Sequence, residues 1–466
     1  MDDSACGKVS QANDLLAWLS NYRESIGCSV EQIDFHESRQ WSLDETHTML
    51  RHASGQFFAI QGYRGSSPGC PDFFQPLINQ PETGTQGFIV RRSGSDFDVL
   101  VQARTEPGNV GLVQIGPTIQ ATYSNYTAVH KGRPQPFLEL FHHPAKFGAR
   151  VLVDTVQPEL GSKFLRKWNR NIVVETKGLS DFADPMFKWV SLSTLTSLMR
   201  LNHVVNNDAR LVVGLLAMEC GPQLFQDRSS FSELVRRSFA SQSSPTFATM
   251  GEASRWLEAI RTRSILTPTE MPLSELPEWT ISDREISHQR GLYFSVIQVR
   301  VHAADREVTD WDQPLLAARH KGQIVLLCKE FQGSLCFLLH AEPQIGNASG
   351  AELQPTFCFD NEEHQETPAA ISQLLNEDQI AHRFSVEASD EGGRFYRCIS
   401  RYDIRMLNSS IHPELPQSYC WLTLGQMRAM LDGPDVISDE SRSILSLFLS
   451  AAFSGHFQSD IHSEAA

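Results

Sequence analysis

The chain has 466 residues, of which 41% are hydrophobic and 9% aromatic, as in an ordinary globular protein. Its formal net charge of −15 argues against nucleic acid as a partner. No apolar run reaches the roughly 20 residues that a membrane-spanning helix needs, and the acidic N-terminus lacks the apolar stretch of a signal peptide. Nine cysteines without a C-x-x-C spacing predict reduced thiols, a cytoplasmic location and no zinc site.

The pattern of the first 65 residues predicts a helix followed by an extended segment. Residues 1–10 are predicted to be a loose terminus, and Asn13 is predicted to cap a helix with apolar positions at Leu15, Leu19 and Tyr22. An extended segment is expected over residues 41–63.

The next stretch predicts paired strands that end in a polar cluster. Residues 87–92 and 96–102 alternate like two strands of a hairpin, with the turn at Ser93–Gly94. The sequence Glu-Pro-Gly-Asn at 106–109 ends the second strand, because Pro fixes φ and Gly permits positive φ. After another short strand, at 112–115, polar residues gather between Thr118 and Tyr126. They predict either a capped turn or a binding site.

The remainder of this half alternates helices and strands. A short helix is predicted over 136–141, strands over 150–157 and 171–175, and helices after Ser191 and over 208–218. The fold class is therefore α+β.

The same pattern occurs twice along the chain. Trp41 and Trp279 lie 238 residues apart, as do Gln75-Pro76 and Gln313-Pro314, and Glu106-Pro107 is matched to Glu342-Pro343. The period is far longer than that of a solenoid repeat. We therefore predict two copies of one domain, residues 13–220 and 251–453, connected by a Ser-containing linker at 221–250.

These features resemble the NDP-hexose 2,3-dehydratase family of deoxysugar biosynthesis. The resemblance covers about residues 13–452 and depends on the repeat, the W…QP element, the Q-A-x-x-EPGN run from Gln102, the PT-x-Q-A-T-x-SNY run from Pro117, and the E-x-G-x-x-F…NRN run from Glu159. It implies two Nudix-like domains per subunit, a homodimer, and no cofactor or metal. It also implies loss of water from C2 and C3 of a dTDP-4-keto-6-deoxyhexose. The product would be a 3,4-diketo-2,6-dideoxy sugar nucleotide, which a downstream 3-ketoreductase would consume.

Such an elimination needs a base for the C3 proton, an acid for the C2 hydroxyl, and donors for the enolate and the diphosphate. We assign Glu106 as the candidate base, Tyr126 as the candidate acid and His130 as a reserve base. A turn carboxylate at Glu106 and a core-edge aromatic at Tyr126 are the structural alternatives. The candidate substrate contacts are Gln75, Gln102, Arg104, Asn109, Gln114, Thr118, Gln120, Thr122, Ser124, Asn125 and Arg170. Arg104 and Arg170 suit the diphosphate, although a salt bridge would explain Arg170 equally well.

The second copy has lost most of the polar cluster, with Cys358, Glu363 and His364 in its place. We therefore expect the working site in the first copy alone, while a site shared between copies or subunits stays open. The alternative function is a non-catalytic nucleotide-sugar-binding protein of the same fold. Tyr123 favours this alternative, because the family usually carries Arg at that position. A Nudix-type hydrolase is disfavoured by the absence of an acidic R-E-x-x-E-E helix.

Overall fold

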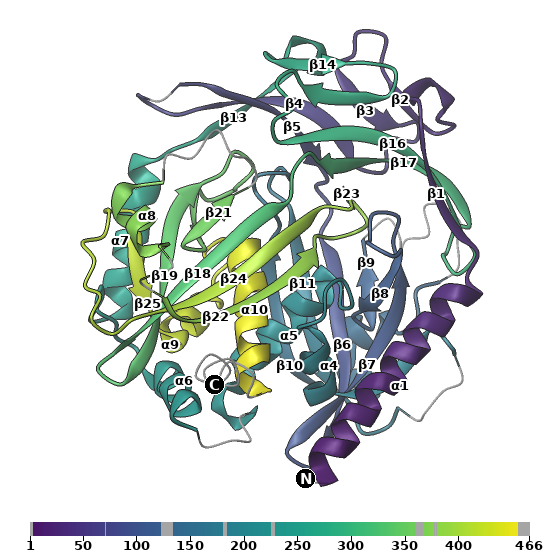
Figure 1. The fold of residues 1–466 in the computed structure, drawn as a ribbon. Helices are drawn as coiled ribbons and strands as arrows, with labels where there is room; N and C mark the ends of the chain where they lie inside the picture. Colours follow the sequence, from purple (N-terminus) through teal and green to yellow (C-terminus); the bar gives the residue numbers. More distant parts are fainter. Residues whose placement is uncertain are drawn as a thin grey trace.

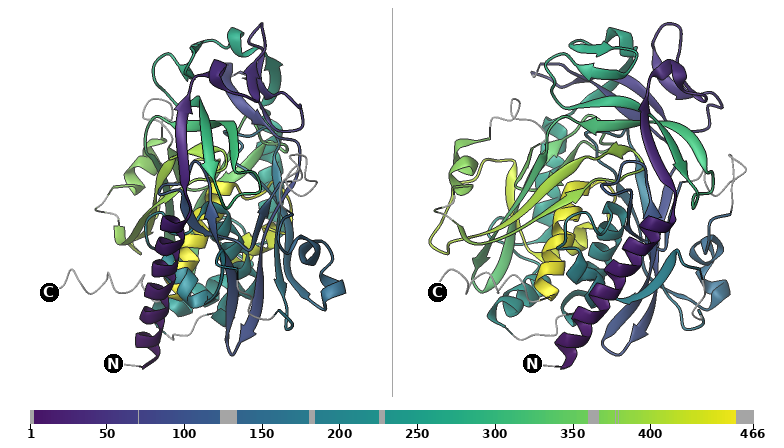
Figure 2. Two further views of the ribbon diagram at one scale, coloured as in Figure 1. Left: turned by 90° about the vertical axis from the view of Figure 1, so that its right-hand side faces the viewer. Right: turned by 45° about the vertical axis from the view of Figure 1, so that its right-hand side comes forward.

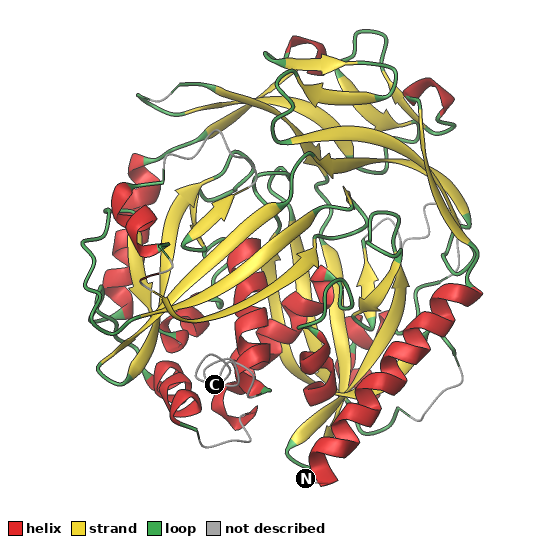
Figure 3. Ribbon diagram, in the orientation of Figure 1, coloured by secondary structure: helices red, strands yellow, loops and turns green. Residues whose placement is uncertain are grey.

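A computed structural model describes residues 3–69, 71–122, 134–179, 184–224, 229–359, 367–376, 378 and 380–454. Two large sheets lie side by side, and two smaller sheets lie across one end of them (Figure 1). Helices fill the space between the large sheets and cover their outer faces (Figure 3). The fold is therefore a mixed α+β architecture with four sheets.

The first large sheet has the strand order β10-β11-β6-β7-β12, with β8 paired to β7 and β9 paired to β6. Only the β11–β6 pair is parallel. The strands are β6 (Gly84–Ser93), β7 (Asp96–Thr105), β8 (Val113–Gly116), β9 (Ile119–Ala121), β10 (Arg150–Pro158), β11 (Trp168–Glu175) and β12 (Phe187–Ser191).

The second large sheet has the strand order β22-β24-β18-β19-β25, with β20 on β19 and β21 on β18. Its one parallel pair is β18–β24. The order of pairings is therefore that of the first large sheet. The strands are β18 (Gly322–Phe331), β19 (Ser334–Pro343), β20 (Ala351–Gln354), β21 (Phe357–Phe359), β22 (Ile380–Ser389), β24 (Ile399–Leu407) and β25 (Tyr419–Leu422).

The two small sheets each contain one strand from the other half of the chain. In the first, β13 (Thr267–Met271) pairs with β4, which also pairs with β3 and β5. In the second, β1 (Cys28–Ile33) pairs with β16, which also pairs with β15 and β17. The remaining strands are β2 (Trp41–Leu43), β3 (Met49–His52), β4 (Ala59–Ser66), β5 (Phe73–Asn79), β14 (Trp279–Ile281), β15 (Glu285–His288), β16 (Phe294–Ala303), β17 (Asp310–Ala318) and β23 (Phe395–Tyr396). This reciprocal exchange ties the two halves together.

Helices α5 and α10 lie at the centre, between the large sheets, whereas α1 and α7 lie on opposite outer sides (Figures 1 and 2). Gly214 permits close approach of α5 to α10, because a Cβ there would lie 2.7 Å from Cβ of Ser446. The helices are α1 (Asp3–Ser25), α3 (Leu138–His142), α4 (Leu192–Leu198), α5 (Asn207–Cys220), α6 (Ser230–Ala240), α7 (Met250–Arg263), α8 (Ala369–Leu374), α9 (Leu424–Met430) and α10 (Asp439–Phe453), with 3-10 turns η1 (Phe35–Glu37), η2 (Pro144–Phe147), η3 (Gly221–Leu224) and η4 (Leu273–Glu275). In the described part of the chain, none of these helices is long and apolar enough to cross a membrane.

One hydrophobic core is shared by both halves. It joins the facing sides of the two large sheets through α4, α5, α9 and α10, with side chains such as Phe88, Val213, Phe337 and Phe448 at 1% exposure or less. A second mixed core lies between the small sheets and includes Trp41 and Trp279. Burial on this scale is the main favourable contribution to folding.

Most predicted elements are present, but two predictions need correction. Helix α1 begins at Asp3 rather than at Asn13, and Asn13 is exposed on its solvent side, where a weak helix former costs little. The β6–β7 hairpin exists, yet Ser93 pairs with Asp96, so the turn lies at 94–95. The connection at 221–250 holds the helix α6, whose Phe231 and Phe239 are buried in the shared core.

Candidate functional site

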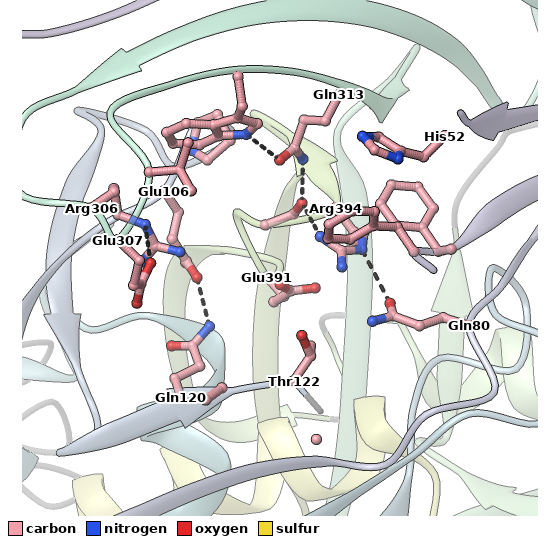
Figure 4. Close-up of a pocket in the computed structure, with 18 of the residues that line it drawn as sticks. His52, Gln80, Glu106, Gln120, Thr122, Arg306, Glu307, Gln313, Glu391 and Arg394 are labelled. Atoms are coloured by element: carbon pink, nitrogen blue, oxygen red, sulfur yellow. Dashed lines mark hydrogen bonds and ion pairs between the residues drawn. The ribbon is translucent and has the colours of Figure 1, made fainter. Parts of the chain in front are cut away.

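A cavity of about 460 Å³ lies between the end of the first large sheet and the small sheets. Its walls come from β6, β7 and β9, from the β2–β3 region, and from two segments of the second half, residues 306–313 and 391–394. Figure 4 shows side chains from both halves converging on the open space. The first copy alone does not form this cavity, because the second half supplies part of the wall; a site shared between the copies, the alternative that the sequence left open, fits this lining.

Glu106 lies at the end of β7, where the Pro107-Gly108 turn begins. The residue is 2% exposed, and its side chain accepts hydrogen bonds from Nε2 of Gln120 at 2.6 Å and Nδ2 of Asn109 at 3.2 Å. Nε of Arg104 lies 3.6 Å from the same carboxylate. Two donors and a cation thus hold an acceptor-only carboxylate at the cavity wall.

Glu391 reaches the cavity from the second half. It lies in the loop after β22, which packs against the Glu106 turn: the N–H of Gly108 donates to the carbonyl of Gly392, and the N–H of Arg397 donates to the carbonyl of Gly108, both at 2.8 Å. Glycine is required at 108, since a Cβ would lie 1.7 Å from the carbonyl oxygen of Phe395. Figure 4 shows the carboxylate of Glu391 directed into the open centre.

The two carboxylates occupy different surroundings. Burial raises the pKa of Glu391 to about 7; Arg394 opposes this shift and Glu106 adds to it. Both groups are close together, since a Cβ on Gly393 would lie 2.3 Å from Oε1 of Glu391 and 3.9 Å from Oε1 of Glu106. Glu391 can therefore carry a proton near neutral pH while Glu106 accepts hydrogen bonds.

Three further buried ionisable groups line the same cavity. Burial raises the pKa of Glu159 to about 8, with Asp439 and Glu391 adding to the shift, and Asn169 donates to its carboxylate. Burial also raises the pKa of Asp208 well above its usual range, and Glu391 and Glu106 contribute. The pKa of Lys167 is lowered by burial, an effect that Glu159 opposes. Such a concentration of perturbed groups is typical of active sites.

Cations and aromatic rings complete the wall. The guanidinium of Arg394 lies 4.2 Å from the ring centre of Phe58 and donates to Oε1 of Gln80 at 3.2 Å. Arg306 lies opposite, with its Nε 3.6 Å from Oε2 of Glu307. Burial lowers the pKa of Arg306, but Glu307 and Glu106 together hold that pKa above its usual value. The rings of Trp41, His52 and Trp311 also line the cavity. The cavity can therefore accept an anionic ligand with a flat apolar group.

Of the residues predicted from sequence, Arg104, Glu106, Gln120 and Thr122 line this cavity. Ser124, Asn125, Tyr126 and His130 lie outside the described residues, as does Tyr123. The other predicted contacts, Gln75, Gln102, Asn109, Gln114, Thr118 and Arg170, are not among the lining residues.

The residues away from the wall have structural partners. Thr118, just before β9, donates to the carbonyl of Leu100 in β7 and accepts from the N–H of Ile89 in β6. Gln75 donates to the carbonyl of Ser162 at 2.8 Å, and Gln102 donates to the sulfur of Met186. Gln114 donates to Ser389 at 3.0 Å. Arg170 forms a bidentate ion pair with Asp154, with both N–O distances 2.7 Å, so the salt-bridge alternative applies.

The proposed match of Glu342 to Glu106 is also wrong. Arg104 pairs with Gln114 across β7 and β8, and Glu342 pairs with Glu352 across β19 and β20. Glu342 thus occupies the position of Arg104. The N–H of Asn109 donates to the carbonyl of Glu106, and that of Asn347 donates to the carbonyl of Gln344, so Gln344 takes the place of Glu106.

The second half has a much smaller hollow at the equivalent place. A cavity of about 30 Å³ is lined by Lys163, Phe294, Asp390, Phe395 and Cys398 among others. Within the described residues, no group of three or more His, Cys, Asp or Glu side chains is arranged to hold a metal ion.

Sequence reasoning missed the contribution of Glu391, Arg394, Arg306 and Asp208. The available signal was a glycine that recurs in both halves, as Gly161 and as Gly392. Each marks backbone that approaches another segment closely. That Gly392 contacts Gly108 is decided by the packing of the halves, which local pattern does not contain.

Comparison with known proteins places the chain in a family. A family model described as NDP-hexose 2,3-dehydratase matches residues 12–216 and again residues 250–448. Three curated proteins are all named dTDP-4-dehydro-6-deoxy-alpha-D-glucopyranose 2,3-dehydratase. The protein of Saccharopolyspora spinosa is 34% identical over 452 residues, covering 95% of this chain and 92% of the relative. The protein of Streptomyces violaceoruber is 33% identical over 445 residues, covering 94% of this chain and 97% of the relative. The protein of Amycolatopsis orientalis is 31% identical over 458 residues, covering 96% of this chain and 92% of the relative.

Among solved structures, one described as an ADP compounds hydrolase is 16% identical and covers 34% of this chain and 83% of that chain. Its TM-score of 0.23 is too low to support an assignment of fold. The family model and the full-length relatives suffice without it: the chain belongs to the NDP-hexose 2,3-dehydratase family.

Proposed function

We propose that the protein is a lyase that removes water across C2 and C3 of a dTDP-4-keto-6-deoxyhexose in deoxysugar biosynthesis. The family and the names of its three relatives support the substrate and the reaction. The observation that carries the chemistry is the pair of carboxylates, Glu106 and Glu391, facing one cavity in different surroundings. An elimination needs such a pair, one member to accept a proton and the other to donate one.

In the proposed reaction, Glu106 takes the proton from C3, which the C4 ketone acidifies by delocalising the electron pair into an enolate. The enolate collapses to a C2–C3 double bond as the C2–O bond breaks, and protonated Glu391 delivers its proton to the departing hydroxyl. Water leaves, and the enol at C3 becomes a ketone when its hydroxyl proton passes to the ionised Glu391 and C2 gains a proton. Glu106 is then protonated and placed to supply that proton, so both carboxylates return to their starting states.

The cations of the wall suit the rest of the ligand. Arg104 lies beside Glu106, where a positive charge stabilises a developing enolate. Arg394 and Arg306 line opposite sides of the cavity and suit the diphosphate (Figure 4). The rings of Trp41 and Trp311 offer apolar faces to the thymine.

The proposal extends to the architecture. We infer that residues 13–220 and 251–453 are copies of one Nudix-like domain. The equal order of strand pairings, the reciprocal exchange of β1 and β13, and the two matches of one family model support this. A homodimer, a cytoplasmic location and a downstream 3-ketoreductase belong to the same proposal.

The test is incubation of the purified protein with dTDP-4-keto-6-deoxyglucose and a 3-ketoreductase that traps the unstable product. The trapped sugar nucleotide should have lost the C2 hydroxyl and carry a methylene group at C2, which distinguishes elimination and tautomerisation from any other turnover. Binding of dTDP without turnover would overturn the lyase and favour the non-catalytic binding protein. Release of dTMP would indicate a Nudix-type hydrolase.

A further inference from the structure

The first turn of α5 contacts the supports of both carboxylates. Asn206 caps this helix, and Arg210 follows one turn later. Both are 1% exposed, and neither is among the residues that line the cavity. Each nevertheless ends a short hydrogen-bonded connection that leads to one carboxylate.

The first connection leads to Glu106. Oδ1 of Asn206 accepts the N–H of Ala209 at 2.9 Å, so Nδ2 is turned toward Gln120 and donates to its Oε1 at 3.0 Å. Gln120 must therefore present Nε2 to Glu106, to which it donates at 2.6 Å. Because an amide has one acceptor end and one donor end, the cap residue fixes the orientation of the Gln120 amide.

The second connection crosses to the other half of the chain. Arg210 donates to the carbonyl of Ser389 at 2.9 Å, and Ser389 is the last residue of β22, two residues before Glu391. The same guanidinium is fixed by the carbonyl of Val205 at 2.8 Å and Oδ1 of Asn207 at 3.0 Å. It thereby anchors the start of the loop that carries Glu391.

We propose that Asn206 and Arg210 are positioning residues for the elimination: Asn206 aims the Gln120 donor at Glu106, and Arg210 fixes the loop that presents Glu391. The inference rests on the proposed function. It makes the first turn of α5 the element that sets the spacing between base and acid, although neither residue reaches the substrate.

The second half supports this assignment by contrast. Ser438 and Arg442 hold the corresponding places on α10, and Arg442 donates to the carbonyl of Pro158, the last residue of β10 and the neighbour of Glu159. The arginine contact is thus made in both directions. The connection through Asn206 has no counterpart in the second half, because Cys358 occupies the position of Gln120. Gln120 and Cys358 each lie two residues after a threonine, Thr118 or Thr356, and the hydroxyl groups of the two threonines make the same backbone hydrogen bonds in their own halves.

The test uses Asn206→Asp and Asn206→Ser in the full-length protein. Both residues keep the N-cap, so the helix should remain folded. Asp presents an acceptor to Gln120 and forces its amide to turn, whereas Ser removes the amide donor without adding charge. We expect kcat to fall at least tenfold in both, KM for the keto sugar nucleotide to change less than threefold, and the acidic limb of the pH profile to move to higher pH. Ser229→Asp, a cap exchange on α6 away from the site, should match the wild type.

Arg210→Lys tests the second connection, because Lys offers a single nitrogen where two terminal nitrogens of the Arg210 guanidinium reach the three oxygen acceptors. Turnover should fall at least tenfold with KM little changed, and added guanidinium should partly restore kcat in Arg210→Ala if that variant folds. Unchanged kcat and pH profile in folded Asn206 and Arg210 variants would overturn the inference while leaving the lyase intact. No turnover by the wild type would instead overturn the proposed function.

Discussion

At the scale of single residues, the site is defined by how two carboxylates are held. Glu106 accepts from two amides and lies 3.6 Å from an arginine nitrogen, whereas Glu391 projects from a loop of the other half into the open cavity. Burial without a matching set of donors favours the neutral form of a carboxyl group. This difference in environment is what assigns the acid and the base.

Glu391→Gln should lower kcat by a factor on the order of 100 or more, because the amide cannot give a proton to the leaving hydroxyl. Since the pKa of Glu391 is about 7 and the acid must be protonated, wild-type kcat/KM should fall above about pH 7. In Glu391→Gln that limb should be absent. A pH profile of kcat/KM for both proteins measures this, and an unchanged limb in the variant would assign the acid elsewhere.

Glu106→Gln should also lower kcat by a factor on the order of 100 or more if Glu106 is the base. The matched control is Glu342→Gln, which changes a carboxylate at the position of Arg104 in the second half, outside the cavity. The turnover of Glu342→Gln should stay near that of the wild type, and any effect of the change should appear in the melting temperature instead. Thermal melts must show that both variants fold; equal loss of turnover in the two would contradict the assignment.

At the scale of elements, the decisive feature is the contact between the turn after β7 and the loop after β22. The same contact recurs in the opposite sense, where the N–H of Gly346 donates to the carbonyl of Gly161 at 2.8 Å. Each half thus presses a glycine turn against the other half's loop. One of these contacts brings Glu391 to the cavity, so the packing of the halves creates the site.

Gly108→Ala should therefore displace the Glu391 loop. The added Cβ would lie 1.7 Å from the carbonyl oxygen of Phe395, so backbone must move. We expect a loss of about 1–3 kcal/mol in the free energy of unfolding and a fall in kcat. Gly27→Ala is the control, since nothing lies within 4 Å of its new methyl group. Wild-type activity in Gly108→Ala would show that this contact does not set the position of Glu391.

How much the sequence could predict follows from the range of each interaction. The β6–β7 hairpin and the end of β7 at Pro107 were predictable, because alternation and turn residues act over a few positions. Glu106, Gln120 and Arg104 were found because they share that local run. Glu391 and Arg394 were not, because their role depends on a contact between distant loops. The Glu342 match failed for a related reason: the Glu-Pro pair recurs two positions away from the structural equivalent.

At the scale of the whole molecule, the halves do not form separate bodies. Each small sheet borrows a strand from the other half, and one hydrophobic core contains α5 of the first and α10 of the second. Elements that share a core and exchange strands unfold together.

We expect one thermal transition for the full chain, detected alike by calorimetry and near-UV circular dichroism. Residues 1–249 and 250–466 expressed separately should fail to fold, because each would expose its side of the shared core and lack one strand. Two resolved transitions in the full chain, or a cooperatively folded half, would contradict this.

The stability of the whole molecule should also depend on pH through its buried carboxyl groups. Burial raises the pKa of Glu159 and of Glu352 to about 8 and that of Glu391 to about 7, from 4.5. Between pH 4.5 and these values the folded state binds more protons than the unfolded state, so the free energy of unfolding must fall as pH rises. The melting temperature should be lower at pH 8 than at pH 5.5.

Glu352→Gln isolates this effect from catalysis, because Glu352 lies in β20 of the second half, away from the cavity, with neither carboxylate oxygen hydrogen-bonded to the described residues. An amide cannot ionise, so the variant should lose less stability than the wild type between pH 5.5 and pH 8 and keep its turnover. The exposed Glu45→Gln is the control and should follow the wild-type curve. A Glu352→Gln curve parallel to that of the wild type would mean that this carboxyl is ionised in the folded protein, with a buried cation such as Arg442 as its partner.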